Sequence, residues 1–115
     1  FCKRGEETIV EVMKAYGDKV RYVHRDYPLP FHQNARKAAE AARCAGEQGK
    51  FWEYHDALFA AEKIGPETMG EIATTLALDK TKFDACLGDG RMKKLIDEDM
   101  EAGSEVGVSG TPAFF

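Results

Sequence analysis

The chain has 115 residues, of which 43% are hydrophobic and 31% are charged, and its formal net charge is -4. This length suits one domain with a modest hydrophobic core, and the mixture of apolar and charged residues argues against disorder. The acidic balance offers no basic stripe for a phosphate backbone, so we expect no nucleic-acid partner. No apolar run approaches the roughly 20 residues that a membrane-crossing helix needs.

The first part of the chain predicts a helix followed by a strand. In residues 3–16 apolar side chains recur at steps of three and four, and Gly17 ends the pattern. Residues 20–27 are rich in β-branched and aromatic side chains, and Pro28 and Pro30 close this segment because proline cannot extend a β-ladder. We therefore predict a helix of about four turns and then one strand.

The middle of the chain predicts a run of helices. An alanine-rich helix is expected over residues 34–47 and an aromatic helix over residues 51–61, whose aromatic stripe we interpret as packing rather than a cofactor site. Pro66 suits the first turn of a third helix, and Asp79 suits the N-cap of a short fourth one. The last predicted helix covers residues 91–105. The chain is thus mostly α and has too few strands to form a sheet alone.

The C-terminal segment predicts a turn and the start of a second strand. Gly107 and Gly110 bracket the turn, and residues 112–115 begin an apolar run. A peptide bond before proline is trans in about 95% of folded cases, so the residues alone favour a trans bond between Thr111 and Pro112.

Cys2 stands directly before the first predicted helix. A helix N-terminus favours a thiolate because its unpaired N–H groups and dipole attract negative charge, and Lys3 and Arg4 add positive charge nearby. Thiolate is the nucleophilic form of cysteine, so the position suits thiol chemistry. The alternative is that Cys2 is merely a small residue near one end of the chain.

The other cysteines and the histidines are scattered. Three cysteines are too few for a disulfide scaffold. Cys44 and Cys86 fall in two predicted helices, where they are either inert buried thiols or a structural disulfide that leaves Cys2 as the free thiol. Cysteines and histidines do not cluster at the short spacings of zinc sites, so we predict no metal site.

Taken together, these features resemble the DsbA-like thiol:disulfide oxidoreductases, which have a thioredoxin fold with a helical insertion. The resemblance rests on Phe1 and Cys2 before the first helix, on residues 27–32 and 44–55, and on residues 107–115. It spans nearly the whole chain.

The resemblance implies an α/β, thioredoxin-like fold with an inserted helical domain, of which this chain is a predominantly α part with an incomplete sheet. Residues 1–30 would form the first part of the thioredoxin-like core, residues 31–106 the inserted helical domain, and residues 107–115 a cis-proline loop and the start of a core strand. The family's central strand is missing from this sequence. We therefore expect strand exchange or oligomerisation between copies of the chain, or else a rearranged or poorly ordered sheet.

In the resembled family a C-x-x-C motif carries the chemistry. Cys2 matches its second, resolving cysteine and Phe1 matches one of the two intervening residues, so the first cysteine would lie two residues before Phe1. Thr111 and Pro112 match the cis-proline loop, whose backbone presents an edge on which a substrate strand lies beside the sulfurs.

The resemblance implies thiol–disulfide exchange on unfolded or partly folded exported proteins, in the periplasm or outside the cell. It allows a membrane-bound redox partner and implies no cofactor besides the cysteine pair. Because the first motif cysteine is missing, we expect little turnover from the 115 residues by themselves. Two alternatives stay open: a kappa-class glutathione transferase or related isomerase, which uses bound glutathione, and a chaperone-like binding domain without turnover.

Overall fold

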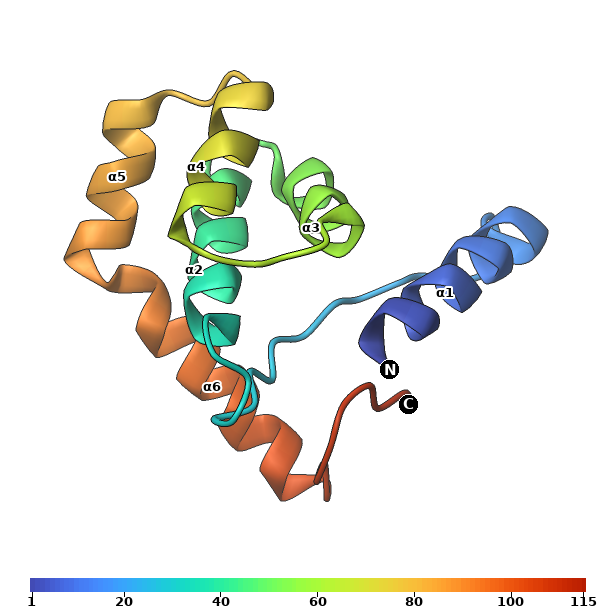
Figure 1. The fold of residues 1–115 in the computed structure, drawn as a ribbon. Helices are drawn as coiled ribbons and strands as arrows, with labels where there is room; N and C mark the ends of the chain where they lie inside the picture. The colour runs from blue at the N-terminus through green and yellow to red at the C-terminus, as the bar shows by residue number, and fades with distance from the viewer.

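A computed structural model of the chain describes residues 1–115 and contains six α-helices and no β-strand (Figure 1). The helices are α1 (Cys2–Tyr16), α2 (Ala35–Gly46), α3 (Phe51–Ala60), α4 (Pro66–Thr75), α5 (Lys80–Asp89) and α6 (Arg91–Glu105). Helices α2 to α6 pack against one another as a helical unit, whereas α1 stands to one side of it (Figure 1). An extended segment, residues 20–29, connects α1 to the helical unit. None of the six helices combines the length and apolar character needed to cross a bilayer.

Local signals set the helix boundaries, and the predicted helices are confirmed with ends that differ by about one residue. Helix α4 begins at Pro66, whose missing N–H costs nothing in a first turn. Asp79 caps α5, because its Oδ1 accepts a hydrogen bond from the Lys82 backbone N–H at 3.1 Å. Gly90 separates α5 from α6 in a left-handed conformation with φ of 69°, which glycine adopts without a steric penalty.

The hydrophobic core lies inside the helical unit around α2. Small alanine side chains on α2 let α3 and α5 approach closely, and the Tyr54 hydroxyl of α3 donates a 2.8 Å hydrogen bond to the Met69 carbonyl oxygen of α4. The buried members of the core are Ala41, Ala42, Cys44, Ala45, Tyr54, Met69, Ile72, Ala73, Phe83, Cys86 and Met92. No residue of α1 belongs to this set.

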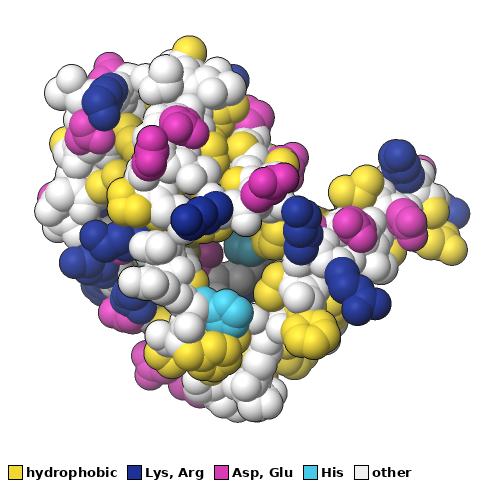
Figure 2. Space-filling model, viewed as in Figure 1, with side chains coloured by type: hydrophobic (Ala, Val, Ile, Leu, Met, Phe, Trp, Pro, Cys, Tyr) yellow, Lys and Arg dark blue, Asp and Glu magenta, His cyan; other side chains and the backbone are white.

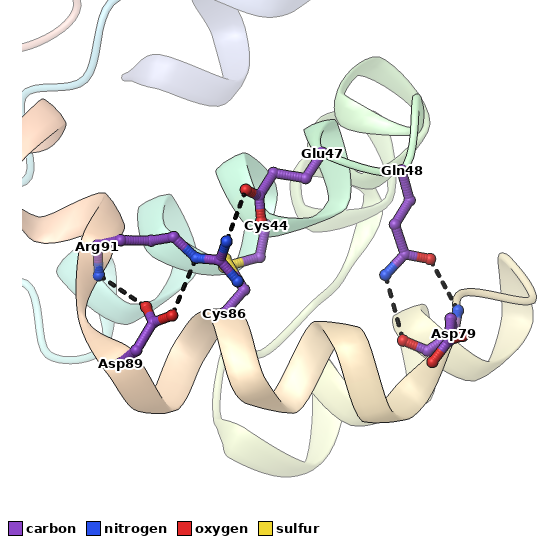
Figure 3. Close-up of a disulfide and its surroundings, with 7 residues drawn as sticks. All are labelled: Cys44, Glu47, Gln48, Asp79, Cys86, Asp89 and Arg91. Atoms are coloured by element: carbon purple, nitrogen blue, oxygen red, sulfur yellow. Dashed lines mark hydrogen bonds and ion pairs between the residues drawn. A yellow bond between two sulfur atoms is a disulfide. The ribbon is translucent and has the colours of Figure 1, made fainter.

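A disulfide joins Cys44 of α2 to Cys86 of α5 in the core (Figure 3). Cys44 and Cys86 therefore form a structural disulfide in this structure and are not two inert buried thiols. Beside it, the Gln48 side chain makes two hydrogen bonds with the Asp79 backbone, donating to the carbonyl oxygen at 3.2 Å and accepting from the N–H at 2.8 Å (Figure 3). The disulfide and these two hydrogen bonds thus connect the C-terminal end of α2 and the turn after it to both ends of α5.

The predicted strands do not form. Residues 20–27 are extended but belong to no ladder, and residues 112–115 also form no strand. A strand needs a neighbouring backbone whose N–H and C=O groups complete its hydrogen bonds, and these two segments do not pair with any other part of residues 1–115. The predictions of a strand at 20–27 and of a core strand from Pro112 are therefore wrong for this structure, and the sheet part of the predicted α/β fold is absent from it.

Buried charges hold the extended segment against the helical unit instead. Arg43 of α2 donates from Nε to Asp26 at 2.5 Å and from Nη2 to Asp99 of α6 at 2.6 Å, and the Asp26 backbone N–H donates to Asp99 at 2.9 Å. Arg25 adds a 2.8 Å bond to Asp99. Burial alone would raise the pKa of Asp26, but hydrogen bonds from His24 and Arg43 and the arginine charge outweigh it, so that pKa lies below its usual value.

Tyr27, near the end of the extended segment, packs against the C-terminal end of α6. The Tyr27 ring lies over Gly103, where an added Cβ would approach two ring carbons at 2.9 Å. The Tyr27 hydroxyl lies 2.9 Å from Ser104 Oγ and donates to the Val108 carbonyl oxygen at 3.2 Å. Glycine at 103 is therefore required by the close approach of the ring.

Candidate functional site

Cys2 is the first residue of α1 and the one cysteine outside the disulfide. Its side chain is partly exposed, and Phe1 occupies the N-cap position with an exposed ring. The first turn contains no acidic side chain and carries Lys3 and Arg4. The thiol thus stands at the start of a helix whose first turn carries two cationic side chains and no acidic one.

The Thr111–Pro112 peptide bond is cis, and its loop lies against the first turn of α1. A Cβ added to Gly5 would lie 3.2 Å from Pro112 Cγ and 3.3 Å from Phe114 Cζ, so glycine at this position permits the contact. Gly5 follows Cys2 by three residues, and residues at that spacing are neighbours on a helix surface. The structure thus brings the Cys2 turn and the proline loop together from opposite ends of the sequence, as the adjacent chain ends in Figure 1 illustrate.

The two chain segments that meet at this junction carry exposed aromatic side chains besides the cations of the first turn. Phe1, Phe114 and Phe115 are all exposed. Figure 2 shows hydrophobic side chains over α1 and beside the chain ends, and a hollow between α1 and the helical unit that histidine side chains border. Contiguous exposed apolar groups of this kind mark contact surfaces. Cys44 and Cys86 take no part in it, because their disulfide is buried between α2 and α5.

The structure also contains a second cluster, which the sequence does not predict. Glu6 of α1, His24 of the extended segment and His55 of α3 meet in space, with one nitrogen or oxygen of each within 4.8 Å of the others. A cavity of about 330 Å³ opens beside His24 and extends past Asp26. No short spacing along the chain reveals the cluster, because the three residues come from separate segments that only tertiary contacts bring together.

Comparison with known proteins gives the family. The thioredoxin family model matches residues 1–115. The Na(+)/H(+) antiporter NhaA 3 of Salinispora tropica is 41% identical over 100% of this chain, which covers 18% of that protein. The Na(+)/H(+) antiporter NhaA 1 of Salinispora arenicola is 39% identical over 100% of this chain and 18% of its own length. The antiporter NhaA of Nitrosospira multiformis is 29% identical over 98% of this chain and 18% of its own length.

The chain therefore spans less than a fifth of the length of these relatives. No solved structure matches it. Because the thioredoxin model covers the chain from its first residue to its last, the chain belongs to the thioredoxin family.

Proposed function

We propose that this chain is part of a DsbA-like thiol:disulfide oxidoreductase in which Cys2 is the resolving cysteine. The observation that carries the proposal is the contact between the first turn of α1 and the cis-proline loop, made by Gly5 with Pro112. A free thiol at a helix start and a cis-proline loop against the same turn are the two halves of a redox site. The first cysteine of the motif would come from the residues before Phe1.

The exchange passes two electrons between substrate and motif. In the oxidising direction, a substrate thiolate attacks the first motif cysteine, the motif disulfide breaks, and Cys2 leaves as a thiolate. A second substrate thiolate then attacks the mixed disulfide, forming the substrate disulfide and releasing the first cysteine as thiolate. The two substrate protons pass to solvent or to the motif thiols. In the reducing direction Cys2 resolves the mixed disulfide by attacking it.

The substrate class that fits is an unfolded or partly folded polypeptide. The backbone of Thr111 offers an edge for an extended segment, and the exposed rings of Phe1, Phe114 and Phe115 provide apolar contacts beside it. The Cys44–Cys86 disulfide supports a setting in an oxidising compartment, the periplasm or the outside of the cell, because reducing cytosol disfavours such bonds.

The relatives carry the name Na(+)/H(+) antiporter, and this chain matches only a small share of their length. We therefore extend the proposal: the domain performs thiol chemistry as one part of a longer protein, beside a transport segment or a membrane-bound redox partner.

The unpaired backbone of residues 20–27 would be completed by a strand from the longer chain or from a second copy. Light scattering of the 115-residue chain and of the parent tests this: a parent that is monomeric while the shorter chain self-associates is expected.

The function is tested on the parent protein that includes the first cysteine. Insulin reduction and oxidation of a reduced, unfolded substrate should both proceed with the wild type. Cys2→Ser should abolish turnover and accumulate a mixed disulfide, because the resolving thiol is gone. Pro112→Ala should lower kcat/KM, whereas Pro66→Ala, at the start of α4 in the helical unit, is the matched control and should not.

Two results would overturn the proposal. Conjugation of glutathione to an electrophile without any disulfide exchange would favour the glutathione transferase alternative. Binding of unfolded chains with no exchange, unaffected by Cys2→Ser, would favour a chaperone-like domain.

A further inference from the structure

Three side chains with metal-ligating atoms meet where α1 approaches the helical unit. Glu6, His24 and His55 each place one such atom within 4.8 Å of the others. The two imidazole rings are 5.0 Å apart and nearly perpendicular, at 78°. Each residue lies on a different segment, so the cluster exists only in the folded chain.

His55 carries a nitrogen without a hydrogen-bond partner. Its side chain is 5% exposed, and Nε2 makes no hydrogen bond although it lies 3.5 Å from Glu6 Oε1. The other ring nitrogen, Nδ1, is 3.0 Å from Asp56 Oδ1. When Nδ1–H donates to this carboxylate, Nε2 carries a lone pair facing Glu6. Histidines that bind metals have this arrangement, in which a carboxylate fixes the far nitrogen.

The other two side chains are also held by a second contact. The Tyr22 hydroxyl donates a 2.9 Å hydrogen bond to Glu6 Oε1. His24 Nε2 lies 3.5 Å from Asp26 Oδ1, so its other nitrogen is not engaged by that carboxylate. Aromatic rings of α3 pack around His55, with Phe59 at 4.8 Å and Trp52 at 5.3 Å between ring centroids. The cluster is thus oriented by outer contacts and bordered by apolar groups, and a cavity opens beside one of its members, His24.

We propose that Glu6, His24 and His55 form a binding site for a divalent transition-metal ion, with Zn²⁺ the best match. Two imidazole nitrogens and one carboxylate oxygen are ligands that zinc favours, and three protein ligands leave a fourth position for water or another small ligand. At zinc–ligand distances of about 2.0–2.2 Å, two tetrahedral ligands lie about 3.3–3.6 Å apart. The His55–Glu6 separation of 3.5 Å already matches this geometry.

The bound ion would connect α1 to α3 and to the extended segment. Helix α1 has no residue in the buried core, so three metal bonds would add substantially to its attachment. Glu6 lies one turn after Cys2 on the same helix, so the ion would also fix the direction of the helix that carries the thiol. The proposal does not depend on thiol exchange, because none of the three ligands is a cysteine.

The test is zinc titration of the full 115-residue chain by calorimetry, with Cys2 first alkylated so that its thiol cannot bind. One Zn²⁺ per chain is expected. Glu6→Gln and His55→Gln should each abolish this binding. Glu7→Gln and His32→Gln are the matched controls, since both residues are exposed and outside the cluster, and they should bind zinc as the wild type does.

A substitution of Asp56, whose carboxylate contacts the far ring nitrogen of His55, tests the site without removing a ligand or a buried group. Asp56 is 77% exposed, so Asp56→Ala should keep the fold by circular dichroism while weakening zinc affinity by about 10–100-fold. Mg²⁺ in excess should not displace the zinc, because it prefers an all-oxygen set. The proposal is overturned if no zinc binds, or if Glu6→Gln, His55→Gln and Asp56→Ala all bind with wild-type affinity.

Discussion

Removal of the Cys44–Cys86 disulfide by a double substitution to alanine should lower the free energy of unfolding by about 4 kcal/mol. The bridge joins residues separated by 42 positions, and the chain-entropy model gives a loss of about 13 cal/mol/K for a loop of that length, or about 4 kcal/mol at 25 °C. A chain of this size has a total stability of about 6–17 kcal/mol at the usual values per residue. The bridge therefore provides a large fraction of it.

The assay is equilibrium urea unfolding followed by far-UV circular dichroism, with Cys2 replaced by serine in both proteins to prevent disulfide rearrangement. The midpoint should fall in the Cys44→Ala/Cys86→Ala variant, and the m-value should rise because the unfolded chain without the cross-link exposes more surface. Cys2→Ser alone should change stability by no more than about 0.5 kcal/mol, as is usual for a partly exposed site. A difference below about 1 kcal/mol between the bridged and unbridged proteins, with equal m-values, would refute the reasoning.

Two further substitutions test the packing. Gly103→Ala should lower the free energy of unfolding by about 1–2 kcal/mol despite its better helix propensity, because the new Cβ would meet the Tyr27 ring at 2.9 Å. Gly70→Ala is the control: nothing lies within 4 Å of its Cβ, so it should raise the free energy of unfolding by up to about 1 kcal/mol. Thermal unfolding measures both, and an equal increase in stability for the two variants would contradict the Tyr27 contact. Tyr54→Phe should cost about 1–3 kcal/mol in urea unfolding, because the buried Met69 carbonyl oxygen loses its donor; an unchanged midpoint would mean that water replaces the hydroxyl.

The helices could be predicted from the sequence because their signals are local. Asp79 and Pro66 act within one turn of their own position, and the apolar spacing of residues 3–16 needs no knowledge of the rest of the chain. Residues 20–27 carry an equally clear local signal for a strand, yet they form none. A β-ladder requires a neighbouring strand, and the residue pattern of one segment does not show whether such a strand is present.

The candidate site could be predicted only in part. The cis bond at Thr111–Pro112 followed from the resemblance, since the residues alone favoured trans, and the structure has the cis form. The aromatic stripe of residues 51–61 predicts a packing role for His55, and the structure does bury it. Its proximity to Glu6 depends on how α1 lies beside α3, which no periodicity in either helix encodes. Trp52, on the same stripe, is exposed rather than buried.

The bridge between α2 and α5 also makes a covalent ring of the polypeptide from Cys44 to Cys86. Lys63 is exposed in the loop between α3 and α4, inside that ring. Cleavage after it by trypsin would open the ring without separating the two pieces, which would migrate together on a gel until a reductant is added. The helical unit can therefore tolerate a nick at this loop that, in a chain without the cross-link, would release α4 to α6.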